Sequence, residues 1–277
     1  MRKLFTAALL AAVSFTGESV QAQTASPYQS PARPYGLNIA APVQLAGSDA
    51  ASANFQANYL SGMLTLINER LGERVPQHNV STLALDPAKL TLSTEAAVRV
   101  YFLGEGAGYR NSLGFNTLTA SMQPGSGIVN GLAKLIFANA STPANGSRTM
   151  QDPLLAGDFV DLGTKAAGSL LDFFLIANGA YGNGNVFTAN TARNADNTPH
   201  VVSFVVANSP YLIIGFEDLW NGGDKDYNDL VFAVNIGAQN VKNLISAPEP
   251  ATLLTMSGFL GVALCSRCRA RYSLTLA

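Results

Sequence analysis

Apolar residues recur at every fourth position in one segment near the N-terminus, residues 52–72. This spacing places them on one face of an α-helix. The stripe consists of Phe55, Tyr59, Met63, Ile67 and Leu71, and Gly72 follows where a helix can end. The pattern predicts an amphipathic helix that packs against another layer, rather than a cofactor-binding element.

From residue 80 onward the apolar pattern shortens to the period of β-strands. Residues 98–103 alternate between two faces, and residues 171–177 place apolar side chains on both. Further strands are predicted at 134–137, 158–162, 201–206, 211–216 and 230–236. The connections are rich in Gly and Asn and include a long polar loop at 178–199. Together these features predict a mainly β domain, a β-sandwich or jelly roll, with the helix on its N-terminal side.

The N-terminal end has the pattern of an export signal. Arg2 and Lys3 precede a short apolar run at 4–15, and Val20-Gln21-Ala22 has the small residues of a cleavage site. Residues 1–22 are therefore predicted to be a signal peptide. Residues 23–47 are rich in Pro, Ser, Ala and Gln and are expected to form a linker or an edge segment. Residues 23–94 then comprise this linker and the helical region.

The C-terminal end carries a second targeting pattern. An apolar run at 251–266 is flanked by Pro248, Glu249 and Pro250 before it and by Arg267, Arg269 and Arg271 after it. A helix over the run, at a rise of ~1.5 Å per residue, is about 24 Å long, slightly less than the ~30 Å hydrocarbon core. We therefore expect a short transmembrane helix with the arginines on the cytoplasmic side.

Residues 248–271 closely resemble the PEP-CTERM sorting signal. The resemblance implies processing by an exosortase-type enzyme in a Gram-negative bacterium. It also implies export across the inner membrane, with display on the cell surface or in an exopolysaccharide matrix. The chain departs from the pattern in having Cys265 and Cys268 near the arginines and an extension at 272–277. A plain C-terminal membrane anchor is the alternative.

Composition narrows the function classes. The net charge is −1 and only 13% of residues are charged, so no basic field attracts nucleic acid. Both cysteines lie near the C-terminus, which excludes a disulfide scaffold. His78 and His200 are the only histidines, and no nucleophile-elbow or phosphate-loop motif is present. The chain is therefore not expected to be an enzyme.

Five of the chain's 18 acidic residues fall between Glu217 and Asp229. Carboxylates packed this closely repel one another, which raises their pKa values unless a cation is present. Asp224, Asp226 and Asn228 match the opening of an EF-hand calcium loop, but the glycine and glutamate expected later in that loop are missing. The segment therefore predicts a Ca²⁺ site on a β-loop. A solvated acidic turn and a catalytic acid pair are the alternatives.

The candidate ligands share oxygen-bearing side chains on or near this loop. They are Glu217, Asp218, Asp224, Asp226, Asn228 and Asp229, with Glu105 from the loop at 104–108 as a further candidate.

The same segment resembles a known family, the domain of unknown function DUF4114. The resemblance rests on residues 216–219, 223–229 and 231–232, with support at 98–111, 135–141, 173–179 and 200–202. It spans roughly 95–236, which leaves 237–247 as a linker before the sorting segment at 248–271. The resemblance implies a β-sandwich, export and Ca²⁺ binding.

The sequence thus predicts an exported, Ca²⁺-binding protein of the cell surface or matrix. Its expected role is structural or adhesive, with exopolysaccharide or surface proteins as partners. The alternatives are a secreted hydrolase or lyase that acts on polysaccharide, and a passive structural protein with no ligand besides the metal.

Overall fold

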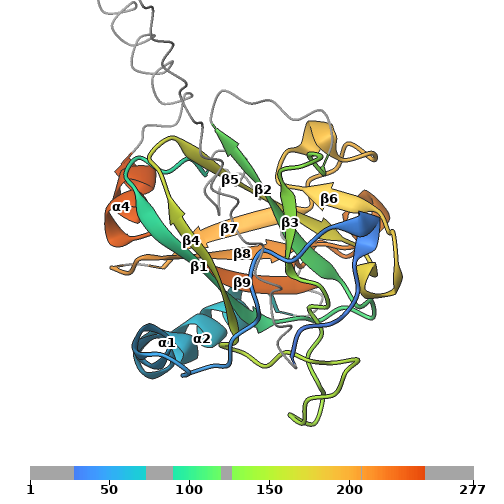
Figure 1. The fold of residues 1–277 in the computed structure, drawn as a ribbon, viewed down its shortest axis with the longest axis horizontal. Helices are drawn as coiled ribbons and strands as arrows, with labels where there is room; N and C mark the ends of the chain where they lie inside the picture. Colours follow the sequence, from blue (N-terminus) through green and yellow to red (C-terminus); the bar gives the residue numbers. More distant parts are fainter. Residues whose placement is uncertain (1–27, 73–89, 120–126, 207, 247–277) are drawn as a thin grey trace, which may run out of the picture.

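A computed structural model describes residues 28–72, 90–119, 127–206 and 208–246 of the chain. Within these ranges, nine strands form two antiparallel sheets (Figure 1). The strands are β1 (Ala96–Gly104), β2 (Ser112–Thr119), β3 (Ala133–Phe137), β4 (Phe159–Lys165), β5 (Ser169–Ile176), β6 (Val186–Thr188), β7 (Val201–Val205), β8 (Tyr211–Phe216) and β9 (Leu230–Asn235). The predicted mainly β architecture is confirmed.

One sheet has five strands in the order β4-β1-β9-β8-β7, and the other has four in the order β3-β2-β5-β6. Their facing sides share one core that includes Val98, Val100 and Phe102 of β1. Two ring pairs cross between the sheets: Phe173 meets Phe232 at a centroid distance of 5.2 Å, and Phe102 meets Phe137 at 6.0 Å. The sheets are therefore held together mainly by apolar burial.

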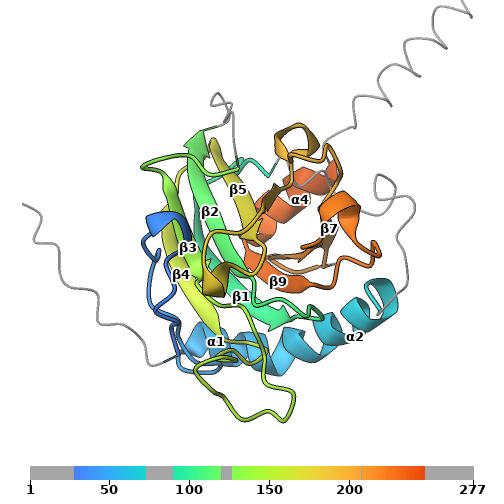
Figure 2. The same ribbon diagram turned by 90° about the vertical axis from the view of Figure 1, so that its right-hand side faces the viewer.

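The predicted helix covers the outer face of the five-stranded sheet (Figure 2). It runs as α1 (Ala50–Phe55), a π-helical turn η2 (Gln56–Leu60) and α2 (Ser61–Arg70), and the Asp49 side chain accepts a hydrogen bond from Ser52 N at its start. Phe55 stacks on Tyr101 at 3.9 Å. On the second face of β1, Tyr101 and Leu103 are consequently buried as well.

The segment at 28–47 joins the edges of the two sheets, as the expectation of an edge segment requires. After the 3₁₀ turn η1 (Pro34–Gly36), Ala40 N donates to Leu135 O of β3 at 2.7 Å. Four residues later, Gln44 exchanges two hydrogen bonds with Phe159 of β4, at 2.8 and 3.0 Å. Both are edge strands, so this segment pairs backbone groups that would otherwise be exposed.

Three elements differ from the sequence prediction. The long loop at 178–199 contains η4 (Gly179–Tyr181), strand β6 and η5 (Thr191–Arg193), and the expected linker at 237–247 forms helix α4 (Ala238–Ser246). The sequence did not predict α4, because its contacts are distant in sequence. The Asn240 side chain accepts hydrogen bonds from the backbone N–H groups of Ser93 and Thr94. Strand β2 was also missed.

β2 was hidden by two residues that rarely mark a strand. Gly114 lies directly under the Phe174 ring of β5, which leaves no room for a side chain. Asn116 is fully buried and donates to Asp172 Oδ2 at 2.6 Å. Both choices are dictated by the neighbouring strand, and no local pattern reveals them.

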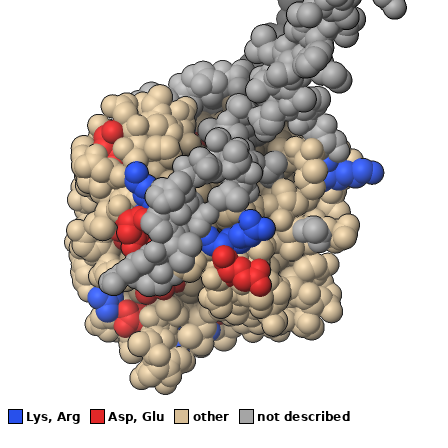
Figure 3. Space-filling model, turned by 180° about the vertical axis from the view of Figure 1, so that it is seen from behind, with Lys and Arg blue, Asp and Glu red and all other residues tan. Residues whose placement is uncertain are grey.

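The predicted signal peptide at 1–22 and the predicted sorting segment at 248–271 lie outside the described residues. Within the described residues, no helix has the length and apolar character needed to cross a membrane. On the face shown in Figure 3, charged side chains form small separate groups on a largely uncharged surface.

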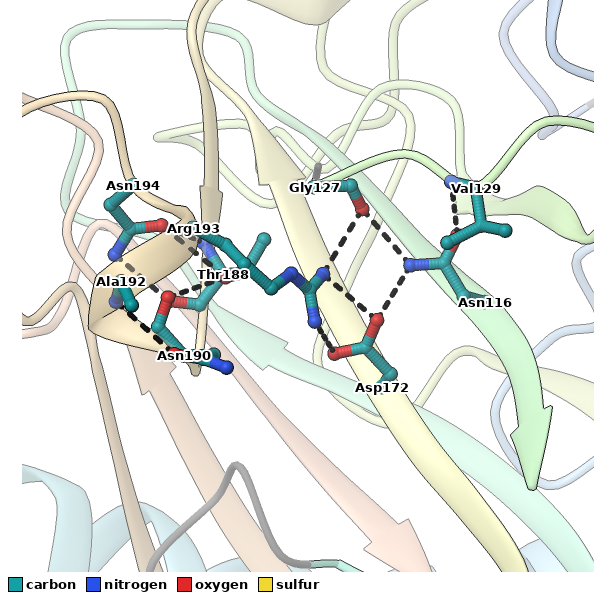
Figure 4. Close-up of polar contacts among 9 residues, drawn as sticks. All are labelled: Asn116, Gly127, Val129, Asp172, Thr188, Asn190, Ala192, Arg193 and Asn194. Carbon is teal, nitrogen blue, oxygen red and sulfur yellow. Dashed lines mark hydrogen bonds and ion pairs between the residues drawn. The ribbon is translucent and has the colours of Figure 1, made fainter. Parts of the chain in front are cut away.

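A buried ion pair anchors the β6–β7 connection to the four-stranded sheet (Figure 4). Arg193 of η5 donates to both carboxylate oxygens of Asp172 at 2.8 and 3.0 Å, and the two side chains are only 7% and 4% exposed. Asn116 donates to the same carboxylate and to Gly127 O. The network satisfies a charge pair that would be costly to bury alone.

We predict that Asp172→Ala lowers the free energy of unfolding by about 3–5 kcal/mol, because it leaves the Arg193 guanidinium buried without its carboxylate. Asp161→Ala is the control. It removes one carboxylate from Arg99, but the Asp161 side chain is 38% exposed and Arg99 keeps Asp49, so the cost is expected to be below about 1 kcal/mol. Urea denaturation measures both, and equal costs would contradict the assigned role of the pair.

Candidate metal centre

The acidic segment connects two neighbouring strands, β8 and β9, at one end of the molecule. Its backbone is unusually bent: Asn221, Gly222, Gly223, Lys225 and Tyr227 all have positive φ angles. At Gly223, with φ +45°, a side chain would collide with Glu217 Oε2. The glycine therefore lets the loop close over the Glu217 carboxylate.

Glu217 is the central residue of the site. Its side chain is fully buried, with 0% exposure. Oε1 accepts a hydrogen bond from Tyr227 N at 2.8 Å, whereas Oε2 is buried with no hydrogen-bond partner. One carboxylate oxygen from each of Glu217, Asp224 and Asp226 lies within 4.8 Å of the others. A buried carboxylate with one unpartnered oxygen thus lies beside two further carboxylates.

Asp226 and Asn228 act as a unit. Asn228 donates to Asp226 twice, from its backbone N at 3.2 Å and from Nδ2 at 2.9 Å. In turn, Gly106 N donates to Asn228 O at 3.0 Å, which ties the loop to the β1–β2 connection. In this arrangement the Asn228 amide orients the Asp226 carboxylate.

Asp218 and Asp229 form a second group beside the first. Asp218 Oδ2 accepts from Asn111 Nδ2 at 2.6 Å, and Asp218 N donates to Asp229 Oδ2 at 2.8 Å. Consecutive residues in extended backbone point to opposite sides, which accounts for the separation of Asp218 from Glu217. The structure therefore brings Glu217, Asp224 and Asp226 together and places Asp218 and Asp229 in a separate pair.

Glu105, the candidate from outside the loop, points elsewhere. Its Oε1 accepts from Thr142 N at 3.2 Å. Glu105 and Asn228 both line a cavity of about 280 Å³ between α2 and the β1–β2 connection. Burial raises the pKa of Glu105. Glu105 is not among the three carboxylates that converge.

His200, directly before β7, supports the acidic loop from the neighbouring strand. Its Nδ1 lies 3.1 Å from Glu217 O and its Nε2 lies 2.8 Å from Asp196 Oδ2. Asp196 also accepts from Asn221 N at 2.8 Å. The imidazole stacks on Phe187 at 3.8 Å. Sequence reasoning missed Asp196 and Asn111, because both lie far from the acidic segment in the chain.

Ionising the buried carboxylates of this loop is energetically unfavourable unless a counter-charge is present. Burial raises the pKa of Glu217 to about 7, with further repulsion from Asp226 and Asp224. Burial likewise raises the pKa values of Asp218 and Asp229. The converging group offers only oxygen atoms, the ligands preferred by hard divalent cations. The residues present therefore fit such a cation, with the unpartnered Glu217 Oε2 as the strongest sign.

Comparison with known families places this loop in a wider context. Residues 166–237 match the model of DUF4114, a domain of unknown function. The DUF4114 match extends from the β4–β5 connection through β9 and includes the whole acidic loop. It begins later than the expected start near residue 95, so β1 to β4 lie outside it. Searches of curated proteins and of solved structures found no significant match.

We predict that the cation-free protein loses stability as the pH rises from about 5 to 8. The folded state holds the Glu217 proton up to about pH 7, whereas the unfolded chain releases it near its usual value of 4.5. Between these values the folded state binds more protons, so raising the pH favours unfolding. Thermal melts in EDTA should show a melting temperature that falls by a few degrees over this range.

Glu217→Gln is the matched variant for this measurement, because it removes the titrating group and keeps the shape. Its melting temperature should fall less over the same pH range. Parallel curves for the two proteins would show that the Glu217 carboxylate is not the group responsible.

Proposed function

We propose that this chain is an exported Ca²⁺-binding β-sandwich protein with a structural or adhesive role at the cell surface or in the extracellular matrix. The observation that carries the proposal is the fully buried Glu217 carboxylate. Its Oε2 lacks a hydrogen-bond partner, and one oxygen of this carboxylate lies within 4.8 Å of an oxygen of Asp224 and of Asp226.

Burial is the first reason to expect a bound cation. Asp226 is 1% exposed and Glu217 is fully buried, so two carboxylates are removed from water within a few ångströms of each other. Leaving a buried carboxylate such as Glu217 ionised without a counter-charge costs several kcal/mol. Within the described residues, Glu217 forms no salt bridge with a lysine or arginine. A bound cation would provide the missing charge.

The ligand atoms and the loop geometry indicate which cation would bind. Glu217, Asp224 and Asp226 supply hard oxygen ligands, and neither histidine nor cysteine belongs to the group. Ca²⁺ accepts six to eight oxygens in flexible geometry, whereas Mg²⁺ demands a near-ideal octahedron. A bent loop with five positive φ angles suits the more flexible ion. When bound, Ca²⁺ would supply a fixed positive charge that holds the loop closed.

A cation at this position would also stabilise the fold. Glu217 follows the last residue of β8, and Asp224 and Asp226 precede β9. A cation held by all three would join the ends of two adjacent strands of the five-stranded sheet. Its effect would be to stabilise the folded domain, by about 2.7 kcal/mol at 100 times the dissociation constant. This is a structural role rather than a catalytic one.

Export and anchoring are supported by the chain ends alone. The signal-peptide pattern at 1–22 would direct export, and the segment at 248–271 would hold or release the protein through an exosortase-type enzyme. Export and anchoring are therefore part of the proposal, because the structure does not describe either segment. Exopolysaccharide or other surface proteins are the partners that this location would offer.

The proposal predicts a Ca²⁺-specific gain in thermal stability. Adding millimolar Ca²⁺ to the EDTA-treated, purified protein should raise its melting temperature by about 5–10 °C, with a much smaller effect from Mg²⁺. Glu217→Gln and Asp226→Asn should each abolish most of the rise. Asp161→Asn, far from the loop, should keep it. An equal rise in all four proteins would refute the site, and no rise in the unaltered protein would refute the proposal.

A separate variant tests the seventh candidate ligand. Glu105→Gln is expected to leave the Ca²⁺-induced rise unchanged, because the Glu105 carboxylate accepts from Thr142 N and lies outside the converging group. Loss of the rise, measured in the same melts, would instead place Glu105 in the metal shell.

A further inference from the structure

Exposed apolar side chains are concentrated on a few loops. Within the described residues, seven large apolar side chains are exposed, and four of them are aromatic. They are Tyr35, Tyr109, Met150, Tyr181, Leu219, Trp220 and Ile245. Six lie on loops or short turns, whereas Ile245 lies on α4. Exposed groups of this kind are common at binding surfaces when they occur together.

Strand pairing brings these loops to the same end of the molecule. Ser112 at the start of β2 pairs with Ile176 at the end of β5, which also pairs with Val186 at the start of β6. In the other sheet, Phe216 at the end of β8 pairs with Leu230 at the start of β9. The connections at 105–111, 138–158, 177–185 and 217–229 therefore gather at one end, which we call the loop end.

Side-chain contacts across the loop end show that these connections touch. Asn111 donates to Asp218 at 2.6 Å, and Ala180 N donates to Arg110 O at 3.0 Å. Arg110 also forms an ion pair with Asp152 at 2.9 Å, and its guanidinium lies 5.9 Å from the centre of the Tyr181 ring. The acidic loop, which carries Leu219 and Trp220, thus contacts the β1–β2 connection of Tyr109, and that connection contacts the turn of Tyr181.

The turn η1 joins the same surface. Tyr35 N donates to Asn183 Oδ1 and Tyr35 Oη donates to Gly184 O, each at 2.5 Å. All four exposed aromatic residues therefore belong to this end.

The chemistry of the loop end suits a carbohydrate. Sugar rings present flat C–H faces, which pack on aromatic rings, and a rim of hydroxyl groups, which needs hydrogen-bond donors and acceptors. Trp220 and Tyr181 are 48% and 66% exposed and offer rings with a polar group. The Arg110 and Asp152 side chains offer donors and acceptors nearby and neutralise each other. An uncharged ligand matches such a surface.

A lipid surface is a poorer match. Binding to an anionic membrane draws on clusters of lysine and arginine, and Arg110 is already paired with Asp152. Three of the four exposed aromatic residues are tyrosines, whose hydroxyl groups favour a polar partner. Membrane binding is accordingly an outcome of the test and not the proposal.

We infer that the loop end binds a neutral carbohydrate chain, with Trp220 and Tyr181 stacking on its rings, and that the cation of the acidic loop controls this binding. The inference rests on the proposed function for its cation. Leu219 and Trp220 lie between Glu217 and Asp224 in the chain, so a cation held by both carboxylates fixes the segment that presents Trp220.

The test uses the purified full-length protein with defined probes. Neutral hexaoses built of β-linked glucose, xylose, mannose or N-acetylglucosamine are titrated by calorimetry, in millimolar Ca²⁺ and in EDTA. At least one is expected to bind saturably in Ca²⁺, with affinity about tenfold or more lower in EDTA. Trp220 is the only tryptophan of the chain, so its fluorescence should change on both cation and sugar binding.

Variants separate the sugar surface from the cation site. Trp220→Ala and Tyr181→Ala should each weaken sugar binding about tenfold, while the Ca²⁺-induced rise in melting temperature is retained. Ile245→Ala, an exposed apolar residue on α4, should change neither. Trp220→Phe should recover part of the affinity, because it restores an aromatic ring.

Three outcomes would overturn the inference. The first is no saturable binding of any hexaose while the Ca²⁺-induced rise is intact, a result that leaves the proposed function standing. The second is equal affinity of Trp220→Ala and the unaltered protein. The third is Ca²⁺-dependent binding to phosphatidylglycerol vesicles, lost in Trp220→Ala, in place of sugar binding. Equal affinity in Ca²⁺ and EDTA would overturn the control by the cation. Failure of the Ca²⁺ melt itself refutes the proposed function separately.

Discussion

The burial of the Glu217 carboxylate is the constraint on which the rest of the site depends. A charge in the protein interior must be paired or coordinated, or it stays protonated. Here Tyr227 N satisfies one oxygen and the other has no partner. The glycine at 223, the Asn228 amide on Asp226 and the support from His200 all serve to hold this arrangement closed. The surrounding backbone thus accepts several unusual torsion angles to keep three carboxylates together.

The two-sheet fold makes that arrangement rigid. β8 and β9 are interior strands of the five-stranded sheet, and both of their faces are buried, one by the four-stranded sheet and one by α1 and α2. Strand ends fixed by packing on both faces move little, so the loop between them starts and ends at defined points. The β6–β7 connection supports the loop as well. Arg193 anchors this connection to Asp172, and the Asp196 carboxylate hydrogen-bonds with the His200 ring and with Asn221 N.

Periodicity alone predicted most of the architecture. The four-residue spacing from Phe55 to Leu71 and the alternation in β1 are local patterns, and both elements formed as expected. β2, β6 and α4 were missed because their residues are chosen by contacts distant in sequence. The cluster of carboxylates was also visible in the sequence. The division of this cluster into two groups was not visible, because the separation of Glu217 from Asp218 depends on how β8 continues into the loop. Likewise, the single tryptophan carried no signal until strand pairing placed its loop at the same end of the molecule as Tyr181.

The order of residues in the loop links the proposed cation site to the exposed ring of Trp220. Glu217 and Asp224 enclose Leu219 and Trp220, so occupancy of the site and the position of the exposed ring are properties of one short segment. If a bound cation raises the affinity for a surface ligand by some factor, the bound ligand must raise the affinity for the cation by the same factor. The proposed cation site would respond to a surface ligand in this way, whereas a site far from the exposed ring would only stabilise the fold.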